Sequence, residues 1–338
     1  MPELKFESLH NHTVISDGTQ THMQALEAAR AAGIGVMAFT DHDTLPDAAA
    51  LQRLREYDGP VKWTVGVELS SYVPKDVGGP DMGALHVLGL FVDVENRDLK
   101  QFCERMERSR RDRMRHILKH LHGLGLEVSE AEVVAAATSK NIVLPHIVKA
   151  VMAHEGNRRL LDQLRERMRQ EAEHDATLKK RYDDMMAEGP QQYPYGLVMT
   201  RHSYVPPAQE QMAALLDLDA TVRLIREAGG LAMLAHWYYD ERKISEEQLA
   251  AVLERGGLDG LETVTVNTIG QRSMAAEMAR ARTLAERVGV AMVMGSDSHS
   301  AADLVAFAGS EYAAASVGQT ARLIERFGPE LTWSNLGA

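Results

Sequence analysis

Histidines and carboxylates recur in short groups along the chain, and their spacing suits metal ions. The first group is His10-x-His12, with Asp17 a few residues further on. Two histidines at i and i+2 on an extended segment point to the same side, so both imidazoles can reach one ion. Taken alone, such a pair is weak evidence, because a histidine pair can equally be structural.

Five further groups follow at or near the ends of apolar stretches. They are Asp41-His42-Asp43, Glu68, His86, His236 and Asp297-x-His299. A carboxylate at the end of an apolar strand is costly to bury unless it is paired or bound to a metal. All six groups recur at a similar place relative to the apolar stretches. This recurrence favours a polynuclear metal site over separate buried polar residues.

The elements that must position these groups can be predicted from hydrophobic periodicity. The predicted strands are 36–40, 61–69, 84–92, 231–235, 260–266 and 291–295, and the predicted helices are 21–32, 47–57, 97–124, 130–138, 219–228, 246–255 and 273–288. This alternation predicts an α/β protein with a parallel sheet. Because α/β barrels place catalytic groups at the carboxyl ends of their strands, the six groups are expected to converge there.

Composition narrows the class of protein. The 338 residues are 45% hydrophobic and 25% charged, which can support a sizeable core and excludes a disordered or fibrous chain. The net charge of −11 repels nucleic acids and anionic membranes, so we expect no stable nucleic-acid partner and no membrane association. A single cysteine, a charged N-terminus and the absence of a membrane-spanning apolar run make the cytoplasm the expected location.

Residues 155–189 differ from the rest because they are dense in both charge signs, with sparse Leu and Met. We interpret them as a helical insertion or cap, with a solvated excursion of no particular role as the alternative. The predicted barrel then comprises 1–154 and 190–338, with a small subdomain around 97–150. A homo-oligomer is left open.

In their order along the chain, the motifs resemble those of the PHP (polymerase and histidinol phosphatase) family of phosphoesterases. The matching motifs are His10-x-His12, Ser16-Asp17-Gly18, Thr40-Asp41-His42-Asp43, Gly-x-Glu68, His86, Ala235-His236 and Gly-Ser-Asp297-x-His299. The resemblance implies a distorted (β/α)7 barrel with three divalent ions, commonly Mn, Fe or Zn. It also implies the ligands of each ion: His10, His12, Glu68 and Asp297 for the first, Glu68, His86 and His236 for the second, and Asp17, His42 and His299 for the third. Asp41 and Asp43 would orient His42 and neighbouring ligands.

Within the family, the chain is most similar to nucleotide and nucleoside-bisphosphate phosphatases and to related small exonucleases. The similarity includes an arginine-bearing helix, Pro145-His146 and Tyr204-Val205-Pro206. The chain departs from this branch at Leu144, at 200–203 and at Trp237. Because such positions recognise phosphate in relatives, the motifs determine the substrate less well than the metal site.

The resemblance implies hydrolysis of a phosphoric ester by attack of metal-activated hydroxide. The candidate catalytic residues are Asp17, His42, Glu68, Asp297 and His202, with His202 or His146 as the acid that assists the leaving oxygen. The candidate substrate ligands are Arg113, His146 and Arg201, although Arg113 could equally lie on a solvated helix face.

The favoured substrate is a small phosphorylated metabolite, a nucleotide or sugar phosphate monoester. The first alternative is an exonuclease or phosphodiesterase acting on short oligonucleotides or cyclic phosphates. The second is a catalytically degenerate PHP regulatory module, which is disfavoured because every ligand position is filled. An amidohydrolase-like enzyme is disfavoured because no lysine stands at a strand end, where it could be carboxylated between two metals.

Overall fold

The structure is a computed structural model that describes residues 3–73, 84–137, 139–200, 202–207, 214–237, 243–266 and 275–337. The chain divides into two compact units. The first, here called the sheet unit, consists of residues 1–106, 214–268 and 274–338. The second, the helical unit, is built mainly from residues 107–213. No helix among the described residues is long and apolar enough to cross a bilayer.

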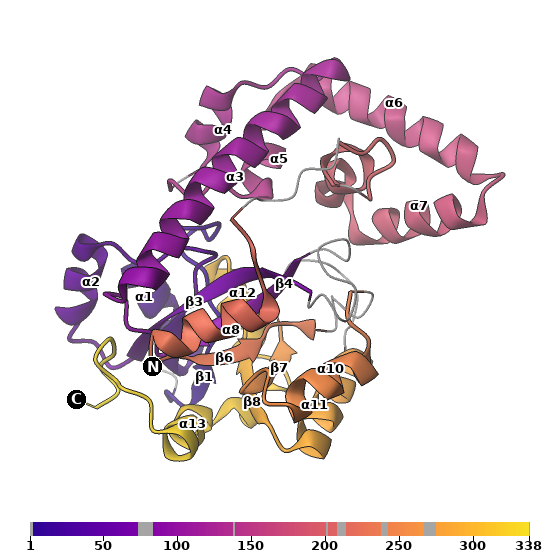
Figure 1. Cartoon of the computed structure of the whole chain (residues 1–338). Coiled ribbons are helices and arrows are strands. Elements are labelled where there is room, and N and C mark those ends of the chain that lie inside the picture. Colours follow the sequence, from indigo (N-terminus) through magenta and orange to yellow (C-terminus); the bar gives the residue numbers. More distant parts are fainter. Residues whose placement is uncertain are drawn as a thin grey trace. The chain divides into compact units, whose positions relative to one another are not determined.

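The sheet unit is organised around one sheet, which has eight strands among the described residues (Figure 1). They are β1 (Phe6–Ser8), β2 (Ile34–Phe39), β3 (Lys62–Tyr72), β4 (Ala84–Leu90), β5 (Leu216–Asp217), β6 (Leu231–Leu234), β7 (Gly260–Thr265) and β8 (Ala291–Gly295). The order across the sheet is β1-β2-β3-β4-β6-β7-β8, and the short β5 pairs with β3. The segment after β1 also meets the end of β8, because Leu9 N donates to Met294 O (3.1 Å) and His12 N donates to Ser298 O (2.8 Å).

Helices accompany the strands, and their starts follow local sequence signals. They are α1 (His22–Ala32), α2 (Ala48–Arg55), the beginning of α3 (Arg97–Gly123), α8 (Leu218–Glu227), α10 (Glu246–Glu254), α11 (Ala275–Val288), α12 (Ala301–Ala308), the 3-10 helix η5 (Ala313–Ser316) and α13 (Gln319–Phe327). Thr21 caps α1 in a capping box with Gln24, and Asp47 and Asp217 cap α2 and α8 through their carboxylates. Side chains of β2, β4, β6 and β8 form a common apolar cluster that includes Ala38, Leu88, Met233 and Val293.

Strand β4 runs antiparallel to both of its neighbours, β3 and β6. The sequence prediction of a parallel sheet is therefore wrong for this strand. A parallel return needs a crossover of about a dozen residues or more, usually with a helix, whereas β3 and β4 are joined only by residues 73–83. The reversal brings His86, near the start of β4, opposite Ser70 near the end of β3. His86 thus reaches the edge where the neighbouring parallel strands end.

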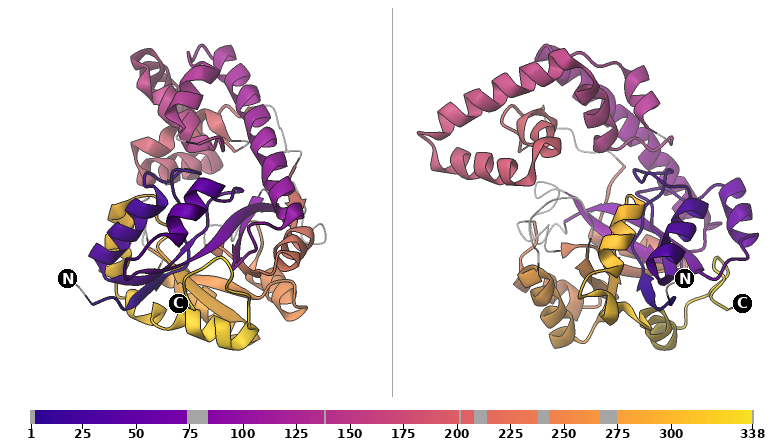
Figure 2. Two further views of the ribbon diagram at one scale, coloured as in Figure 1. Left: turned by 90° about the vertical axis from the view of Figure 1, so that its left-hand side faces the viewer. Right: turned by 180° about the vertical axis from the view of Figure 1, so that it is seen from behind.

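The helical unit contains the rest of α3 and the helices that follow it. They are α4 (Glu130–Ala136), α5 (Leu144–Ala153), α6 (Glu155–Ala172), α7 (Ala176–Glu188), the 3-10 helix η3 (Pro190–Gln192) and the π-helix η4 (Tyr195–Met199). Helices α6 and α7 lie side by side as a hairpin (Figure 2). The sequence predictions did not include α5, although a proline in the first turn, such as Pro145, is compatible with a helix.

One apolar core runs through the helical unit and joins α6 and α7 to the preceding helices. It includes Leu121, Ile147, Leu161, Met168 and Met185. The stretch 155–189 does form two helices, as predicted. Its apolar residues nevertheless share a core with α3 and α5, so the predicted boundary at residue 155 does not coincide with the boundary of this compact unit.

Candidate metal centre

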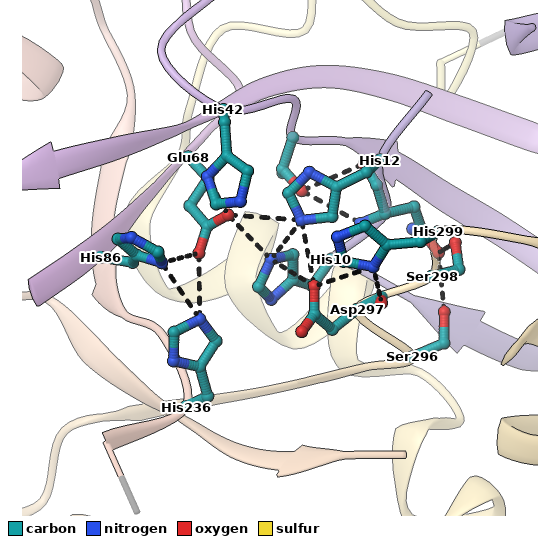
Figure 3. Close-up of polar contacts among 12 residues, drawn as sticks. His10, His12, His42, Glu68, His86, His236, Ser296, Asp297, Ser298 and His299 are labelled. Atoms are coloured by element: carbon teal, nitrogen blue, oxygen red, sulfur yellow. Dashed lines mark hydrogen bonds and ion pairs between the residues drawn. The ribbon is translucent and has the colours of Figure 1, made fainter. Parts of the chain in front are cut away.

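All nine predicted metal ligands belong to the sheet unit and form contiguous groups at one edge of the sheet. They follow β1 (His10, His12, Asp17), β2 (His42), β6 (His236) and β8 (Asp297, His299), or lie within β3 (Glu68) and β4 (His86). Figure 3 shows the labelled imidazole and carboxylate groups turned toward one another. Segments that are separated by most of the chain therefore contribute to one cluster.

The first predicted ligand set converges around two ring nitrogens. Nε2 of His10 and Nε2 of His12 lie 3.1 Å apart. Oδ1 of Asp297 lies 3.4 Å from the first nitrogen and 3.0 Å from the second. Oε2 of Glu68 completes the group at 3.4 and 3.3 Å from the same two nitrogens. These four side chains can therefore direct one donor atom each toward a common point.

The second predicted set gathers around the other oxygen of Glu68. Oε1 lies 3.1 Å from Nδ1 of His86 and 3.1 Å from Nε2 of His236. The two ring nitrogens are 3.4 Å apart. Because the two oxygens of Glu68 face different histidines, this carboxylate could be shared by two ions.

The third predicted set is looser. Oδ1 of Asp17 lies 3.5 Å from Nε2 of His299, and Oδ2 lies 3.8 Å from Nε2 of His42. Nδ1 of His12 also approaches Oδ1 of Asp17 at 3.7 Å, so His12 touches both the first and the third set. His42 likewise reaches Glu68, with 2.8 Å between Nδ1 and Oε2. The sets predicted separately from the sequence are thus parts of one continuous cluster.

Several donor atoms of the cluster fit a divalent cation. Within the described part of the chain, His12 Nδ1, Asp17 Oδ1 and Glu68 Oε2 are buried and make ion pairs but no well-oriented hydrogen bond. An unsatisfied buried polar atom costs free energy, and a coordinated ion would satisfy it. Imidazole and carboxylate donors are ligands that Zn, Mn and Fe share. The residues present therefore suit bound divalent metal.

The buried carboxylates and imidazoles shift one another's pKa values. Burial opposes ionisation of Glu68, but His42, His86 and His10 outweigh it and lower the pKa of Glu68 well below its usual value. Burial likewise disfavours the charged form of His299, but Asp17 outweighs it and raises the pKa of His299 to about 10. For His12, burial dominates, and His299 and His42 add to it, so its pKa falls to about 4. The carboxylates are consequently held ionised, as metal ligands must be.

The backbone at the cluster adopts unusual conformations. Asp43, His236 and Asp297 have φ angles of 48°, 27° and 49°, in the left-handed region that residues other than glycine rarely occupy. Such strain persists only where the surrounding structure enforces it, and it concentrates at functional sites. Two of these three residues are predicted ligands.

Asp41 and Asp43 contact the loops that carry the cluster, while their predicted role in orienting His42 stays a prediction. Oδ1 of Asp41 accepts hydrogen bonds from Thr13 N (2.7 Å) and Ser16 Oγ (2.6 Å), so Asp41 orders the loop that carries His12 and Asp17. Asp43 accepts from Ser70 N (2.7 Å) and Ser70 Oγ (2.9 Å), which ties the loop after β2 to β3. Both carboxylates therefore position loops.

Sequence reasoning missed Asn11, the residue between the first two histidines. Its Oδ1 accepts from the hydroxyls of Ser8 (2.8 Å), Ser296 (2.9 Å) and Ser298 (3.1 Å). Its Nδ2 donates to the carbonyls of Ser8 and Ala38, both at 2.8 Å. Asn11 thus fastens the His10-x-His12 segment to the loop after β8. Its position between two ligands was visible in the sequence, but its distant serine partners were not.

A second missed residue is Glu262 in β7. Its Oε1 lies 2.9 Å from Nδ1 of His10, and its Oε2 accepts a hydrogen bond from the backbone N–H of His236 (2.8 Å). Glu262, like Glu68, is a carboxylate within a predicted strand, and this pattern was visible in the sequence.

The predicted substrate-binding residues lie in the other unit. His146 is buried on α5, where its Nδ1 accepts from Val143 N at 3.2 Å. Arg113 is half-buried on α3, and His202 is exposed, with its carbonyl accepting a hydrogen bond from Arg181. Arg201 lies outside the described residues. The roles of these four residues in substrate binding or acid catalysis remain predictions.

Comparison with known proteins places this geometry in context, although no family model matches the chain. A curated relative from Eggerthella lenta, phosphoribosyl 1,2-cyclic phosphate 1,2-diphosphodiesterase, is 27% identical over 295 residues. The match covers 87% of this chain and 94% of the relative.

Two solved structures share the fold. A protein from Bifidobacterium adolescentis, assigned as a metal-dependent phosphoesterase, has a TM-score of 0.61 at 23% identity and is matched over 88% of this chain and 89% of its own. An amidohydrolase from Chromobacterium violaceum, solved with bound sulfate and no metal, has a TM-score of 0.62 at 20% identity and 89% coverage of each chain.

The two solved structures show that the fold is shared, and the described residues supply histidine and carboxylate groups of the kind that bind divalent metal. The motif resemblance agrees with these comparisons, which include a curated relative named as a diphosphodiesterase.

Proposed function

We propose that the chain hydrolyses a phosphoric ester with divalent ions held by the nine-residue cluster. The observation that carries this proposal is the placement of Glu68. Its Oε1 faces His86 and His236 at 3.1 Å and its Oε2 faces three other histidines at 2.8–3.4 Å, in the way a carboxylate shared by two ions would. Its side chain is fully buried, so an ionised Glu68 needs nearby positive charge.

The number of ions and the closure of the sheet belong to the same proposal. The described residues form four overlapping groups of possible ligands, which support binding of more than one ion, and we propose three divalent ions, of Mn, Fe or Zn. The backbone hydrogen bonds between the segment after β1 and the end of β8 support a distorted (β/α)7 barrel, with the helical unit as its insertion.

The chain's own residues prepare this site for a phosphate group. Bound divalent ions would activate water and neutralise phosphoryl charge. Asp17, Glu68 and Asp297 would supply negative charge that balances the cations, and the low exposure of their side chains, 6%, 0% and 13%, limits the weakening of these interactions by bulk water. We further propose that Arg113, His146 and Arg201 bind the substrate, with His202 as the acid for the leaving oxygen.

For the substrate, we propose a small cyclic phosphodiester. The curated relative is named for action on a cyclic phosphate and matches nearly its whole length to this chain. This comparison supports the phosphodiesterase alternative better than the phosphate monoester that the sequence favoured. The net charge of −11 supports a small substrate over a long nucleic acid, whose other phosphates would be repelled.

A substrate panel tests the proposal. Purified protein supplied with Mn²⁺ would be assayed with a ribose 1,2-cyclic phosphate, the matching monoester, a nucleoside 3′,5′-bisphosphate and a short RNA. We expect the highest kcat/KM for the cyclic phosphodiester, with ³¹P NMR showing the ring phosphate converted into a monoester. A higher kcat/KM for the monoester would restore the earlier substrate prediction. Failure to release or open any phosphate ester with metal bound would overturn the proposed activity.

A further inference from the structure

Glu262 has no role in the proposed chemistry, yet it is in contact with two metal ligands. It lies in the middle of β7, and its side chain is 0% exposed. One carboxylate oxygen contacts the ring of His10, and the other holds the backbone of His236. A carboxylate in a fully buried strand is costly unless both oxygens are used, and here both are.

The contact with His10 determines which ring nitrogen is available. A carboxylate can only accept, so Nδ1 of His10 carries the proton that lies 2.9 Å from Oε1 of Glu262. In the neutral imidazole the lone pair is then on Nε2, the nitrogen that faces His12 and Asp297. Glu262 therefore selects the tautomer of His10 that can act as a ligand.

The contact with His236 fixes the backbone of a ligand in the other set. The φ angle of His236 is 27°, an unfavourable value for a residue with a side chain. Its N–H donates to Oε2 of Glu262 at 2.8 Å, while its Nε2 lies 3.1 Å from Oε1 of Glu68. Holding the N–H keeps the strained residue in the conformation that directs its ring to Glu68.

We propose that Glu262 is a positioning residue. It fixes the predicted ligand set that contains His10 relative to the set that contains His236, and the two sets share Glu68. It does so by orienting the ring of His10 and the backbone of His236 at once. The inference rests on the metal site of the proposed function, and it concerns metal affinity rather than the choice of substrate.

Glu262→Gln separates this role from simple packing, because the two side chains have nearly the same size. An amide has one accepting oxygen and one donating NH₂ group. If the oxygen faces His236 N–H, the NH₂ group meets Nδ1 of His10 and favours the tautomer with its proton on Nε2. If the amide is turned round, the NH₂ group opposes the N–H of His236. Either orientation disrupts one of the two ligands.

Glu7 provides a matched control. It is a buried carboxylate on β1 of the same unit, 8% exposed. Its oxygens also accept from backbone N–H groups, those of Gly318 (2.8 Å) and Thr320 (2.7 Å). Glu7→Gln therefore disturbs a similar hydrogen-bonding pattern without touching a predicted metal ligand.

The experiment measures Zn²⁺ affinity by chelator competition, together with bound metal per chain and Tm, for the full-length wild type and both variants. We expect Glu262→Gln to bind the weakest-held ion 10- to 100-fold less tightly, the usual effect of losing a group that orients a ligand. Glu7→Gln should lower Tm but leave the affinity within about twofold of wild type. Equal Zn²⁺ affinity in wild type and Glu262→Gln would overturn the inference, whereas a wild type that binds no metal would instead overturn the proposed function.

A measurement on the wild type keeps the inference testable even if Glu262→Gln does not fold. Long-range ¹H–¹⁵N spectra of the Zn²⁺-loaded protein report which nitrogen of each imidazole carries a proton. We expect His10 to be protonated at Nδ1 and coordinated through Nε2. Coordination of His10 through Nδ1 would show that Glu262 does not orient it.

Discussion

In the sheet unit, the ion pairs at the cluster join residues far apart in the chain, such as His10 with Glu262 and His12 with Asp297. In the helical unit, many ion pairs join residues three or four positions apart on one helix, such as Arg169 with Glu166 and with Glu173. The side chains of His10 and Glu262 are 0% exposed, whereas that of Arg169 is 44% exposed. The ion pairs of the cluster are therefore shielded from water, whereas those of the helical unit are exposed to it.

Burial therefore marks the groups able to do chemistry better than the number of charges does. An exposed pair on a helix gains little, because water already solvates both partners. A buried charge must be compensated by a partner, a hydrogen bond or an ion. The charge-rich stretch 155–189 is conspicuous in the sequence, but the groups able to act on a substrate phosphate through metal are the few buried ones in the sheet unit.

The largest expected effect comes from removing the shared carboxylate. Glu68→Gln keeps the size of the side chain but removes the charge that faces both groups of histidines. We expect loss of bound metal and a fall in kcat/KM of ~10³-fold or more, because several kcal/mol of transition-state stabilisation depend on the ions. Metal analysis and steady-state kinetics on the best substrate of the panel measure both effects.

Arg169→Ala is the control in the helical unit, because it removes an exposed cation with two local partners. We expect kcat/KM within about twofold of wild type and Tm within about one degree. If both variants lost activity to a similar degree, the contrast between buried and exposed charge would not hold.

The next prediction tests whether metal binding by the sheet unit is independent of the helical unit. Replacing 155–189 with a short Gly-Ser linker removes Leu161, Met168 and Met185 from the core of the helical unit. We expect faster hydrogen exchange in α4 and α5, since their apolar partners are lost, and altered substrate preference. Bound metal should remain near the wild-type amount, because every predicted ligand belongs to the sheet unit. Loss of metal in this variant would show that the cluster depends on the helical unit.

A smaller effect is expected from pH on the metal-free protein. Burial alone would lower the pKa of His236, but Glu68 outweighs it and raises this pKa to about 9, and the pKa of His299 is raised to about 10. A histidine whose pKa is higher in the folded than in the unfolded protein stabilises the fold. This stabilisation is complete below the unfolded pKa of about 6.5 and is lost as the pH rises through the folded pKa. The Tm of chelator-treated protein should therefore fall by several degrees between pH 7 and pH 10.

Metal-loaded protein provides the comparison for this pH series. Its ligating imidazoles are already neutral, so the same alkaline step should lower Tm much less. Differential scanning fluorimetry of the two forms, side by side, measures the difference. Parallel declines would mean that His236 and His299 do not hold protons in the metal-free cluster.

Much of the fold could be predicted because its signals are local. Thr21 and Asp47 marked the starts of α1 and α2, and most strands read as short apolar runs because they are buried on both faces. The direction of β4 could not be predicted, because a run of apolar residues has the same pattern in either direction. The helix α5 was not predicted, because its N-cap residue, Val143, makes no side-chain cap hydrogen bond and gives no local start signal.

The nine candidate metal ligands could be chosen from the sequence, because most are histidines or carboxylates within or just after apolar runs, where residue type alone makes them visible. How these side chains are held depends on the folded arrangement. Asn11 meets Ser296 and Ser298, and Glu262 meets His10, across more than 250 positions of the chain. Such contacts depend on strand order and register, which arise from the packing of the whole sheet and leave no local pattern in the sequence.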